Sequence, residues 1–322
     1  MALKVLMMGT GEFALPTLQT LADSEHDVVG LVTQPDRILR GKHVHPHPMK
    51  ELAAGRGITV FQPDNVNTPE SLQTLRDFGA DIFVVAAYGQ ILSAELLSIP
   101  RLGAVNLHGS LLPKYRGAAP IQYAVWCGEA ETGVTIFQIE PKLDAGPMYG
   151  SVATPIGPDD TSKDVHDRLA GLAAPLTLDV LSQLDAGTAT GTRQDTQGVT
   201  RAPKIPKSAG LIDWSKSSRE IDCHIRAMQP WPNPWTFLDS GDGNIKRILI
   251  LKVAPVHLAQ HDESTSPGTI LEAPAGELHV RTADGALAVN LLQPEGKRAM
   301  STEEFLRGTP LSGGAHFTNG PA

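Results

Sequence analysis

The chain has 322 residues, 41% of them hydrophobic, which is enough for a sizeable core and two domains of ordinary size. Its formal net charge of −8 argues against general nucleic-acid binding, so any contact with RNA must come from local basic segments. Every apolar run is shorter than the about 20 residues of a membrane span, the start lacks a signal-peptide layout, and Cys127 and Cys223 are too far apart for a zinc motif. We therefore expect a protein of the reducing cytosol, with no membrane contact.

A glycine-rich turn follows the first predicted strand. Residues 3–8 are an apolar run typical of a buried strand, and Gly9-Thr10-Gly11-Glu12-Phe13-Ala14 then fits the G-x-G-x-x-A pattern of dinucleotide sites. This turn predicts a helix over 16–22 and a second strand over 28–34. That strand ends in Gln34-Pro35 and lacks the acidic residue that binds a nicotinamide ribose. We therefore interpret the glycines as a tight turn that serves the fold, and predict no NAD site.

The next segment is a basic loop. Its basic residues outnumber its single acidic residue: they are Arg37, Arg40, Lys42 and Lys50, against Asp36. Three alternating histidines, His43, His45 and His47, resemble metal ligands. The prolines between and after them break any regular strand, however, and no cysteine or carboxylate joins them. We therefore predict a phosphate-binding loop and no metal site.

Alternating helices and strands continue through the first half of the chain. Helices are predicted over 49–56, from Thr68-Pro69 to 78, and after Ser93; strands are predicted over 59–61 and 81–87. The strand 81–87 ends in a loop, Tyr88-Gly89-Gln90-Ile91. This alternation predicts a doubly wound, mostly parallel α/β sheet of Rossmann-like type.

Two polar residues occupy the end of the next predicted strand, residues 103–108. Asn106 and His108 are two residues apart and so share one face. Strands inside parallel sheets are normally apolar, and ligands bind at their carboxyl ends. The position therefore favours a functional site, although a core histidine and asparagine satisfied by their neighbours remain the alternative. A loop then leads to a helix that begins near Pro120.

The second half of the chain changes character twice. Strands are predicted over 132–139 and 149–155 with Asp144 in the turn between them, and Thr161 with Asp164 caps a helix that ends near 185. Residues 187–210 are rich in Gly, Thr and Pro, and carry an excess of basic residues: Arg193, Arg201, Lys204 and Lys207, against Asp195. We expect domains at 1–189 and 210–322, joined by a basic linker at 190–209.

The C-terminal domain is predicted to be a small antiparallel β-barrel. After a helix over 218–228, short apolar segments recur at 248–253, 268–271, 277–281 and 286–292 with turn residues between them. Ser301 with Glu304 is predicted to cap a last helix, and the tail after Arg307 is predicted to be loose.

Several motifs together resemble one enzyme family. Asn106-Leu107-His108-Gly109-Ser110-Leu111-Leu112-Pro113, the Arg-Gly-Ala-Ala-Pro-Ile-Gln of 116–122 and Leu143-Asp144-Ala145-Gly146 resemble the signature of the folate-dependent formyltransferases. The sequence of residues 115–122 is most similar to that of the family members that act on methionyl-tRNA. Ile-Asp-Trp at 212–214, Pro-Trp-Pro at 230–232 and the segment 293–297 match the C-terminal domain of those members, which resembles an OB-like barrel.

The resemblance implies direct formyl transfer from the co-substrate 10-formyltetrahydrofolate to the α-amine of methionyl initiator tRNA, in translation initiation. In the family, the matching Asn106 and His108 hold the oxyanion, and Asp144 orients or charges the histidine. The folate-binding residues implied are Gly89, Gln90, Ile91, Ser110, Leu111, Leu112 and Pro113. The residues expected to contact tRNA are Arg37, Arg40, Lys42, Lys204 and Lys207. No metal and no protein partner are implied.

Other functions remain open at this stage. Formyltransferases that act on an amino-sugar nucleotide share many of these motifs. The sequence of residues 116–122 and the basic loop favour tRNA as the acceptor. A nicotinamide oxidoreductase would need the missing acidic residue. A non-catalytic RNA-binding protein would leave Asn106, His108 and Asp144 without a role. Asp144 taken alone could also be an ordinary turn residue before Gly146.

Overall fold

The computed structural model describes residues 2–36, 47–241, 245–256, 265–311 and 313–320. Contacts divide it into two compact units, neither of which is one continuous stretch of chain. The first unit contains the described residues of 1–121, 131–155 and 164–203, and the second contains those of 122–130, 156–163 and 204–322. The predicted linker, 190–209, is therefore divided between the two units after Pro203.

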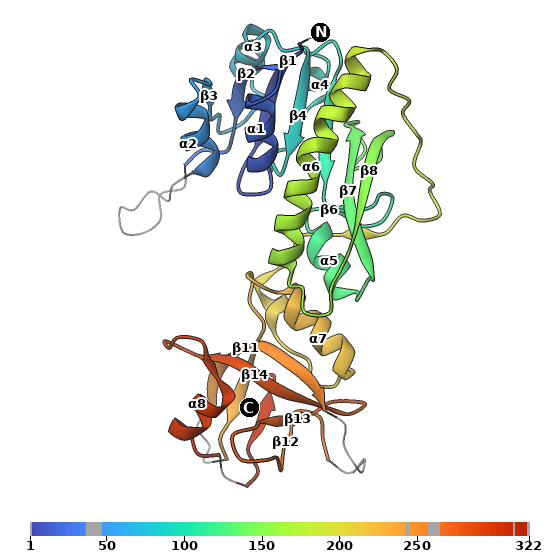
Figure 1. The fold of residues 1–322 in the computed structure, drawn as a ribbon. Coiled ribbons are helices and arrows are strands. Elements are labelled where there is room, and N and C mark those ends of the chain that lie inside the picture. The colour runs from blue at the N-terminus through green and yellow to red at the C-terminus, as the bar shows by residue number, and fades with distance from the viewer. Residues whose placement is uncertain (1, 37–46, 242–244, 257–264, 312, 321–322) are drawn as a thin grey trace. The chain divides into compact units, whose positions relative to one another are not determined.

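The first unit is built around a seven-stranded sheet in the order β3-β2-β1-β4-β5-β7-β8 (Figure 1). Its strands are β1 (Lys4–Gly9), β2 (Asp27–Val32), β3 (Val60–Phe61), β4 (Ile82–Ala86), β5 (Ala104–His108), β7 (Glu131–Gln138) and β8 (Met148–Pro155). Neighbours from β3 to β5 pair in parallel, whereas β5, β7 and β8 pair antiparallel. The prediction of a mostly parallel sheet is confirmed, and the β7–β8 hairpin extends it with antiparallel strands.

Helices cover both faces of this sheet. They are α1 (Leu15–Ala22), α2 (Pro48–Gly55), α3 (Pro69–Asp77), α4 (Ala94–Leu97) and α6 (Ser162–Asp185), whose first two residues belong to the second unit. The helix α5 (Pro120–Trp126) begins in the first unit, but most of its residues belong to the second. The helices α3 and α4 pack their leucines against the Leu6 and Phe83 face, and Figure 1 shows α1 and α6 passing in front of the sheet. The predicted caps are confirmed, since Thr68 accepts from the Ser71 N–H and Ser93 from the Leu96 N–H.

The glycine turn after β1 serves close packing. A Cβ on Gly9 would lie 2.8 Å from Cβ of Ala14 and 2.9 Å from the carbonyl oxygen of Ala86, so only glycine fits there. The helix that follows has Pro16 in its first turn, and proline has no N–H to offer a pyrophosphate. These features agree with a structural turn.

The second unit is a small antiparallel barrel. Its strands are β10 (Trp235–Asp239), β11 (Ile245–Val256), β12 (Ile270–Leu271), β13 (His279–Arg281), β14 (Ala286–Pro294), β15 (Met300–Ser301) and β16 (His316–Thr318). They pair in the order β12-β13-β14-β11-β10-β16, with β15 on β14. A bridge between Thr269 and His316 joins the two ends of this order and closes the barrel. The OB-like prediction is confirmed in this form.

Two helices accompany the barrel, α7 (Ser218–Ala227) and α8 (Thr302–Gly308), and a short 3₁₀ helix, η1 (Lys207–Gly210), precedes them. The predicted cap of α8 is confirmed, because Ser301 and Glu304 form a reciprocal capping box. Ser217 and Glu220 form the same box at α7. The barrel core gathers Trp214, Ile221 and Ile225 with the inward side chains of the strands.

The prediction of a loose tail after Arg307 is wrong. Residues 316–318 form β16, which pairs with β10, and the Phe317 N–H donates to the carbonyl of Gly268 at 2.8 Å. The Phe317 side chain is 3% exposed and stacks on Trp214, with the ring centroids 5.2 Å apart. The tail therefore completes the barrel and part of its core.

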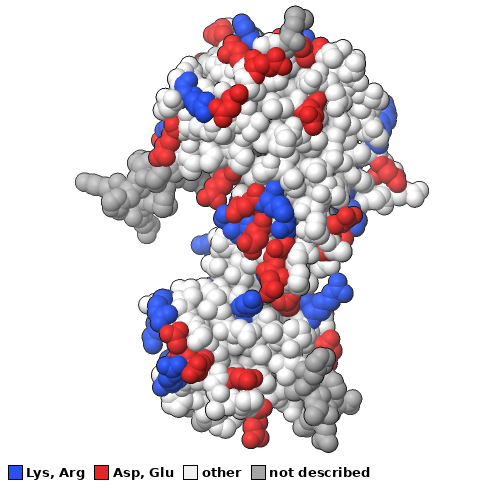
Figure 2. All heavy atoms as spheres, in the orientation of Figure 1, with Lys and Arg blue, Asp and Glu red and all other residues white. Residues whose placement is uncertain are grey.

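Charged side chains of both signs are mixed on the face shown in Figure 2. In the second unit, Arg298 pairs with Glu304 at 2.8 Å and Arg307 pairs with Glu303 at 2.9 Å, beside and on α8. All four side chains are exposed, so these pairs contribute little to stability. Each pair joins one positive and one negative charge, so its members add no net charge to this surface.

Candidate active site

Strand β5 carries the two polar residues on which the sequence prediction centred. Asn106 is half-buried and His108 is buried, and both belong to one face of the sheet because they are two residues apart. β5 runs parallel to β4 on one side and antiparallel to β7 on the other. The loops that follow β4 and β5 therefore leave the sheet at the same edge as His108.

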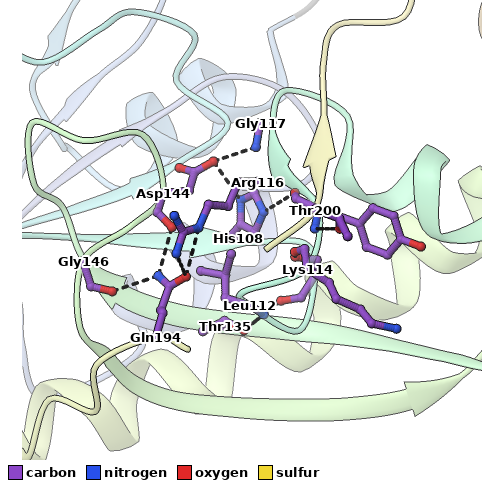
Figure 3. Close-up of polar contacts among 12 residues, drawn as sticks. His108, Leu112, Lys114, Arg116, Gly117, Thr135, Asp144, Gly146, Gln194 and Thr200 are labelled. Carbon is purple, nitrogen blue, oxygen red and sulfur yellow. Dashed lines mark hydrogen bonds and ion pairs between the residues drawn. The ribbon is translucent and has the colours of Figure 1, made fainter. Parts of the chain in front are cut away.

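The two ring nitrogens of His108 have different surroundings (Figure 3). Nε2 lies 2.9 Å from the carbonyl oxygen of Tyr115, and because a carbonyl can only accept, Nε2 carries the hydrogen and donates it. Nδ1 lies 3.8 Å from Oδ2 of Asp144, which is too far for a hydrogen bond. A neutral imidazole with its lone pair on Nδ1 fits both distances.

Burial lowers the pKa of His108 below its ordinary value of 6.5, and the positive charge of Arg116 acts in the same direction. The carboxylate of Asp144 and the carbonyl of Tyr115 act in the opposite direction, because both stabilise the imidazolium. Since the lowered pKa leaves the imidazole neutral near pH 7, His108 is able to accept a proton there.

Asp144 lies in the turn between β7 and β8, and its carboxylate is fixed. Oδ2 accepts a hydrogen bond of 2.8 Å from the backbone N–H of Gly117, and 13% of the side chain is exposed. The residue has a φ of +46°, a left-handed conformation that is uncommon for a non-glycine residue. Tyr115, whose carbonyl binds His108, also has a positive φ, of +60°. Unusual backbone at two positions around one histidine is typical of a functional site.

The loop that follows β5 is held by Thr135 of β7. The Thr135 hydroxyl donates to the carbonyl of Ser110 at 2.7 Å and accepts from the N–H of Leu112 at 3.1 Å. The hydroxyl of Ser110 in turn donates to the carbonyl of Lys114 at 2.6 Å. Leu111 and Pro113 are half-buried, and Leu112 is 7% exposed, so little of the Leu112 side chain is available to a ligand.

The loop after β4 is fixed through Gln90, and it presents an apolar side chain. Gln90 accepts from the N–H of Val66 at 2.9 Å and donates to the carbonyl of Pro63 at 3.2 Å. The adjacent Ile91 is 88% exposed, and Gly89 has a φ of +85°. A fixed backbone with an uncovered aliphatic side chain fits a flat, partly apolar ligand at this edge.

The residues expected to contact tRNA are only partly described. Arg37, Arg40 and Lys42 lie outside the described residues, as do His43 and His45. His47 is described, and its Nε2 lies 3.0 Å from the Thr33 hydroxyl. Lys204 and Lys207 are exposed in the second unit, and neither has an ion pair with another described residue. Within the described ranges, no group of three or more His, Cys, Asp or Glu could hold a metal ion.

Two polar residues beside the site were missed by sequence reasoning. The guanidinium of Arg116 donates to the side chain of Gln194, which comes from the predicted linker and also reaches the Asp144 turn (Figure 3). Arg116 lay within the recognised motif, so its position could have drawn attention. Gln194 carries no local signal, because a glutamine in a polar, glycine-rich segment is ordinary.

A cavity of about 710 Å³ lies elsewhere, entirely within the second unit. Its lining is mostly apolar and includes Tyr123, Trp126, Leu211 and Ile221. None of the predicted catalytic or folate-binding residues lines it. The predicted catalytic and folate-binding residues all lie in the first unit.

Comparison with known proteins identifies the family. The family model described as formyl transferase matches residues 1–181, and the model described as formyl transferase, C-terminal domain, matches residues 204–310. The chain belongs to the formyl transferase family. A methionyl-tRNA formyltransferase from Methylococcus capsulatus is 43% identical over 312 residues, which are 97% of this chain and 98% of that one.

Solved structures share the fold of this formyl transferase at low identity. HypX from Aquifex aeolicus, in complex with tetrahydrofolic acid, matches with a TM-score of 0.60 at 14% identity over 95% of this chain and 47% of HypX, so the chain spans about half of HypX. An N-formyltransferase from Helicobacter canadensis, in complex with folinic acid and dTDP-3-aminofucose, matches with a TM-score of 0.63 at 17% identity over 89% of this chain and 98% of that one. No described helix of this family member is long and apolar enough to cross a membrane.

Proposed function

We propose that this chain transfers the formyl group of 10-formyltetrahydrofolate to the α-amine of methionyl initiator tRNA, in the cytosol and as a step of translation initiation. One observation carries the choice of acceptor: the likeness to a methionyl-tRNA formyltransferase extends over 97% of the chain at 43% identity. The Helicobacter canadensis N-formyltransferase, solved with dTDP-3-aminofucose, is far less similar, at 17% identity, and its likeness concerns the fold alone. Both cysteines are free thiols, which agrees with a reducing compartment.

The geometry of His108 supports a role as the base in this transfer. The attacking amine forms a bond to the formyl carbon and must then lose a proton. Nδ1 of His108 takes this proton, because its lone pair is free while Nε2 is held by the Tyr115 carbonyl. The resulting Nδ1–H faces the Asp144 carboxylate, which stabilises the imidazolium.

The tetrahedral intermediate carries a negative charge on the former formyl oxygen. The side-chain amide of Asn106 donates to this oxygen, and the protonated Nδ1 of His108 can do so as well. When the intermediate collapses, the bond from the carbon to N10 of the folate breaks and the leaving nitrogen takes the proton from His108. The histidine returns to its neutral form, so no covalent enzyme intermediate is needed.

The two loops at the sheet edge are proposed to hold the folate. The backbone of Gly89 and Gln90 is positioned by the Gln90 side chain, and Ile91 offers its exposed apolar surface to the pterin. Residues 110–113 would line the other side, with backbone positions set by Thr135. The reaction needs no metal in this scheme.

The acceptor tRNA is proposed to contact the basic residues Arg37, Arg40, Lys42, Lys204 and Lys207. The domain that contains residues 210–322 would assist this binding. Lysine and arginine bind phosphate without reading sequence, so this part of the proposal concerns affinity and not the choice of initiator tRNA.

Formyl transfer to charged initiator tRNA tests the proposal directly. We expect the purified chain to formylate methionyl-tRNA with 10-formyltetrahydrofolate as the donor, and to leave a dTDP-linked amino sugar unmodified. Asn106→Ala and His108→Ala should each lower kcat by about 100- to 1,000-fold, the usual cost of losing an oxyanion donor. Formylation of the sugar nucleotide alone would refute the proposed acceptor, and wild-type turnover in both variants would refute the proposed site.

A further inference from the structure

The side chain of Gln194 joins three separate segments around the catalytic histidine. Its Oε1 accepts from Nε and Nη2 of Arg116, at 3.1 and 2.6 Å. Its Nε2 donates to the carbonyl oxygens of Asp144 and Gly146, both at 2.9 Å. The amide oxygen thus accepts two hydrogen bonds and the NH₂ group donates two, so the hydrogen-bonding capacity of the side chain is fully used. Figure 3 shows all four contacts.

Only one orientation of this amide satisfies its partners. A guanidinium can only donate and a carbonyl can only accept, so a flipped amide would place N–H against N–H and oxygen against oxygen. Glutamine is therefore matched to its neighbours in a way that neither glutamate nor a smaller residue could reproduce. Glutamate could keep the contact with Arg116 but would set its charge against two carbonyl oxygens.

The backbone that carries Gln194 is anchored on both sides. Upstream, Thr192 and Met148 exchange two backbone hydrogen bonds of 2.8 Å at the start of β8. Downstream, the Tyr115 N–H donates to the Thr200 hydroxyl at 2.8 Å, and β9 (Arg201–Ala202) pairs with β6 (Arg116–Gly117). A Cβ on Gly117 would lie 2.4 Å from the Ala202 carbonyl oxygen, so glycine allows this close pairing. The segment 192–202 is thus held to the first unit near both of its ends, although most of its residues are exposed.

The residues that Gln194 holds are those that determine the state of His108. Asp144 and Arg116 are the charged groups that act on this histidine, and Gln194 contacts both. The left-handed backbone of Asp144 needs support from its surroundings, and the hydrogen bond from Gln194 to its carbonyl supplies some of it. Gln194 therefore holds the backbone of Asp144, while the Gly117 N–H holds its carboxylate.

We propose that Gln194 is a positioning residue for formyl transfer, which acts by fixing the Asp144 turn and Arg116 at their distances from His108. This inference rests on the proposed function. Gln194 itself touches neither substrate nor reacting atoms in the scheme. Through this one side chain, the predicted linker positions the site as well as connecting the domains.

Steady-state kinetics of Gln194→Ala over a range of pH tests this. We expect kcat to fall about 10- to 100-fold, as is usual when a supporting contact is lost, with KM for folate and tRNA nearly unchanged. Loss of Gln194 releases both the Asp144 turn and Arg116, whose charges act on the pKa of His108 in opposite directions. The Asp144 charge has the larger effect, so its weaker support of the imidazolium should move the acid limb of the kcat profile to lower pH. A purely structural defect would lower the amount of active enzyme without moving this midpoint.

Two further variants sharpen the test. Gln194→Glu keeps an acceptor for Arg116 but loses both donors, and should resemble Gln194→Ala in kcat. Gln197→Ala removes an exposed glutamine three residues away on the same segment, and should behave as wild type. If Gln194→Ala matches Gln197→Ala in kcat and in pH profile, the inference is wrong. If the wild-type chain does not formylate methionyl-tRNA at all, the proposed function fails first, and the two failures are distinguishable.

Discussion

At the scale of single residues, the two nitrogens of the His108 ring have different partners, and the proposed proton transfer depends on this difference. The Tyr115 carbonyl accepts a hydrogen bond from the proton on Nε2. Burial lowers the pKa of the ring, so Nδ1 carries no proton near pH 7. The Asp144 carboxylate lies 3.8 Å from Nδ1, where it stabilises the positive charge of the ring that has accepted a proton. In the proposed mechanism, His108 therefore removes a proton and later returns it without a change of tautomer.

Replacing Asp144 by Asn tests this arrangement. The pKa of His108 is lowered by burial and partly restored by the Asp144 charge, so removing that charge lowers the pKa further. Since the neutral ring is the active base, the acid limb of kcat should move to lower pH. The plateau rate should fall, because the imidazolium loses its partner. Rates over pH 5–9 measure both effects; the substrate amine titrates alike in each enzyme, and an unmoved midpoint would contradict the assigned coupling.

The sequence could identify these residues but not their geometry. Asn106 and His108 are polar where a strand should be apolar, and Asp144 belongs to a recognisable motif. The choice of ring nitrogen depends on the left-handed turn at Tyr115, which places a carbonyl seven residues later beside the ring. Gln194 lies 50 residues from Asp144 along the chain. No local pattern reports a contact of that kind.

At the scale of secondary-structure elements, sequence patterns predicted those elements that are stabilised by contacts between residues near in the chain. The caps Thr68, Ser93 and Ser301 were predicted because a capping residue bonds the backbone two or three positions later. Strands that exist only through distant partners were missed: β6 and β9 pair across 85 residues, and β16 pairs with β10 across about 80. A three-residue strand after a glycine-rich stretch resembles a frayed tail until its partner is known.

Phe317→Ala tests the structural role of β16. The ring is buried in the barrel core against Trp214, so its removal leaves a cavity and should lower the free energy of unfolding by about 3–5 kcal/mol. His316→Ala, at an exposed neighbour on the same strand, is the matched control. Chemical denaturation measures the difference. A loose tail would tolerate both changes within about 0.5 kcal/mol.

At the scale of the whole molecule, an acidic protein has to hold a polyanion. A net charge of −8 spread evenly would repel tRNA, so attraction depends on where the basic residues are left uncompensated. The charge of one basic side chain is compensated within the protein, since Lys50 pairs with Asp36 at 2.6 Å. Lys204 and Lys207 are exposed, and no described acidic side chain pairs with them.

Reversing both charges, Lys204→Glu with Lys207→Glu, should raise KM for tRNA. It should also reduce the salt dependence of binding, by about one unit of log–log slope for each lost phosphate contact. The pair Lys204→Arg and Lys207→Arg keeps the charge and should retain both properties, and folate binding should not change in either pair. We expect the same from reversing Arg40 and Lys42. Wild-type tRNA affinity in both reversed pairs across a salt titration would place the RNA elsewhere.

The interleaving of the two units along the chain bears on how such a protein can be recombined. Residues 122–130 and 156–163 belong to the second unit, although they lie between segments of the first, and 192–203 belong to the first, beyond the end of its last long helix. A single crossover after residue 189 would exchange Gln194 and Thr200 together with the barrel. A crossover after 203 would keep them but leave 122–130 and 156–163 beside a foreign barrel. A recombinant chain is therefore expected to keep its contacts best when both units come from the same parent, even though each unit has its own core.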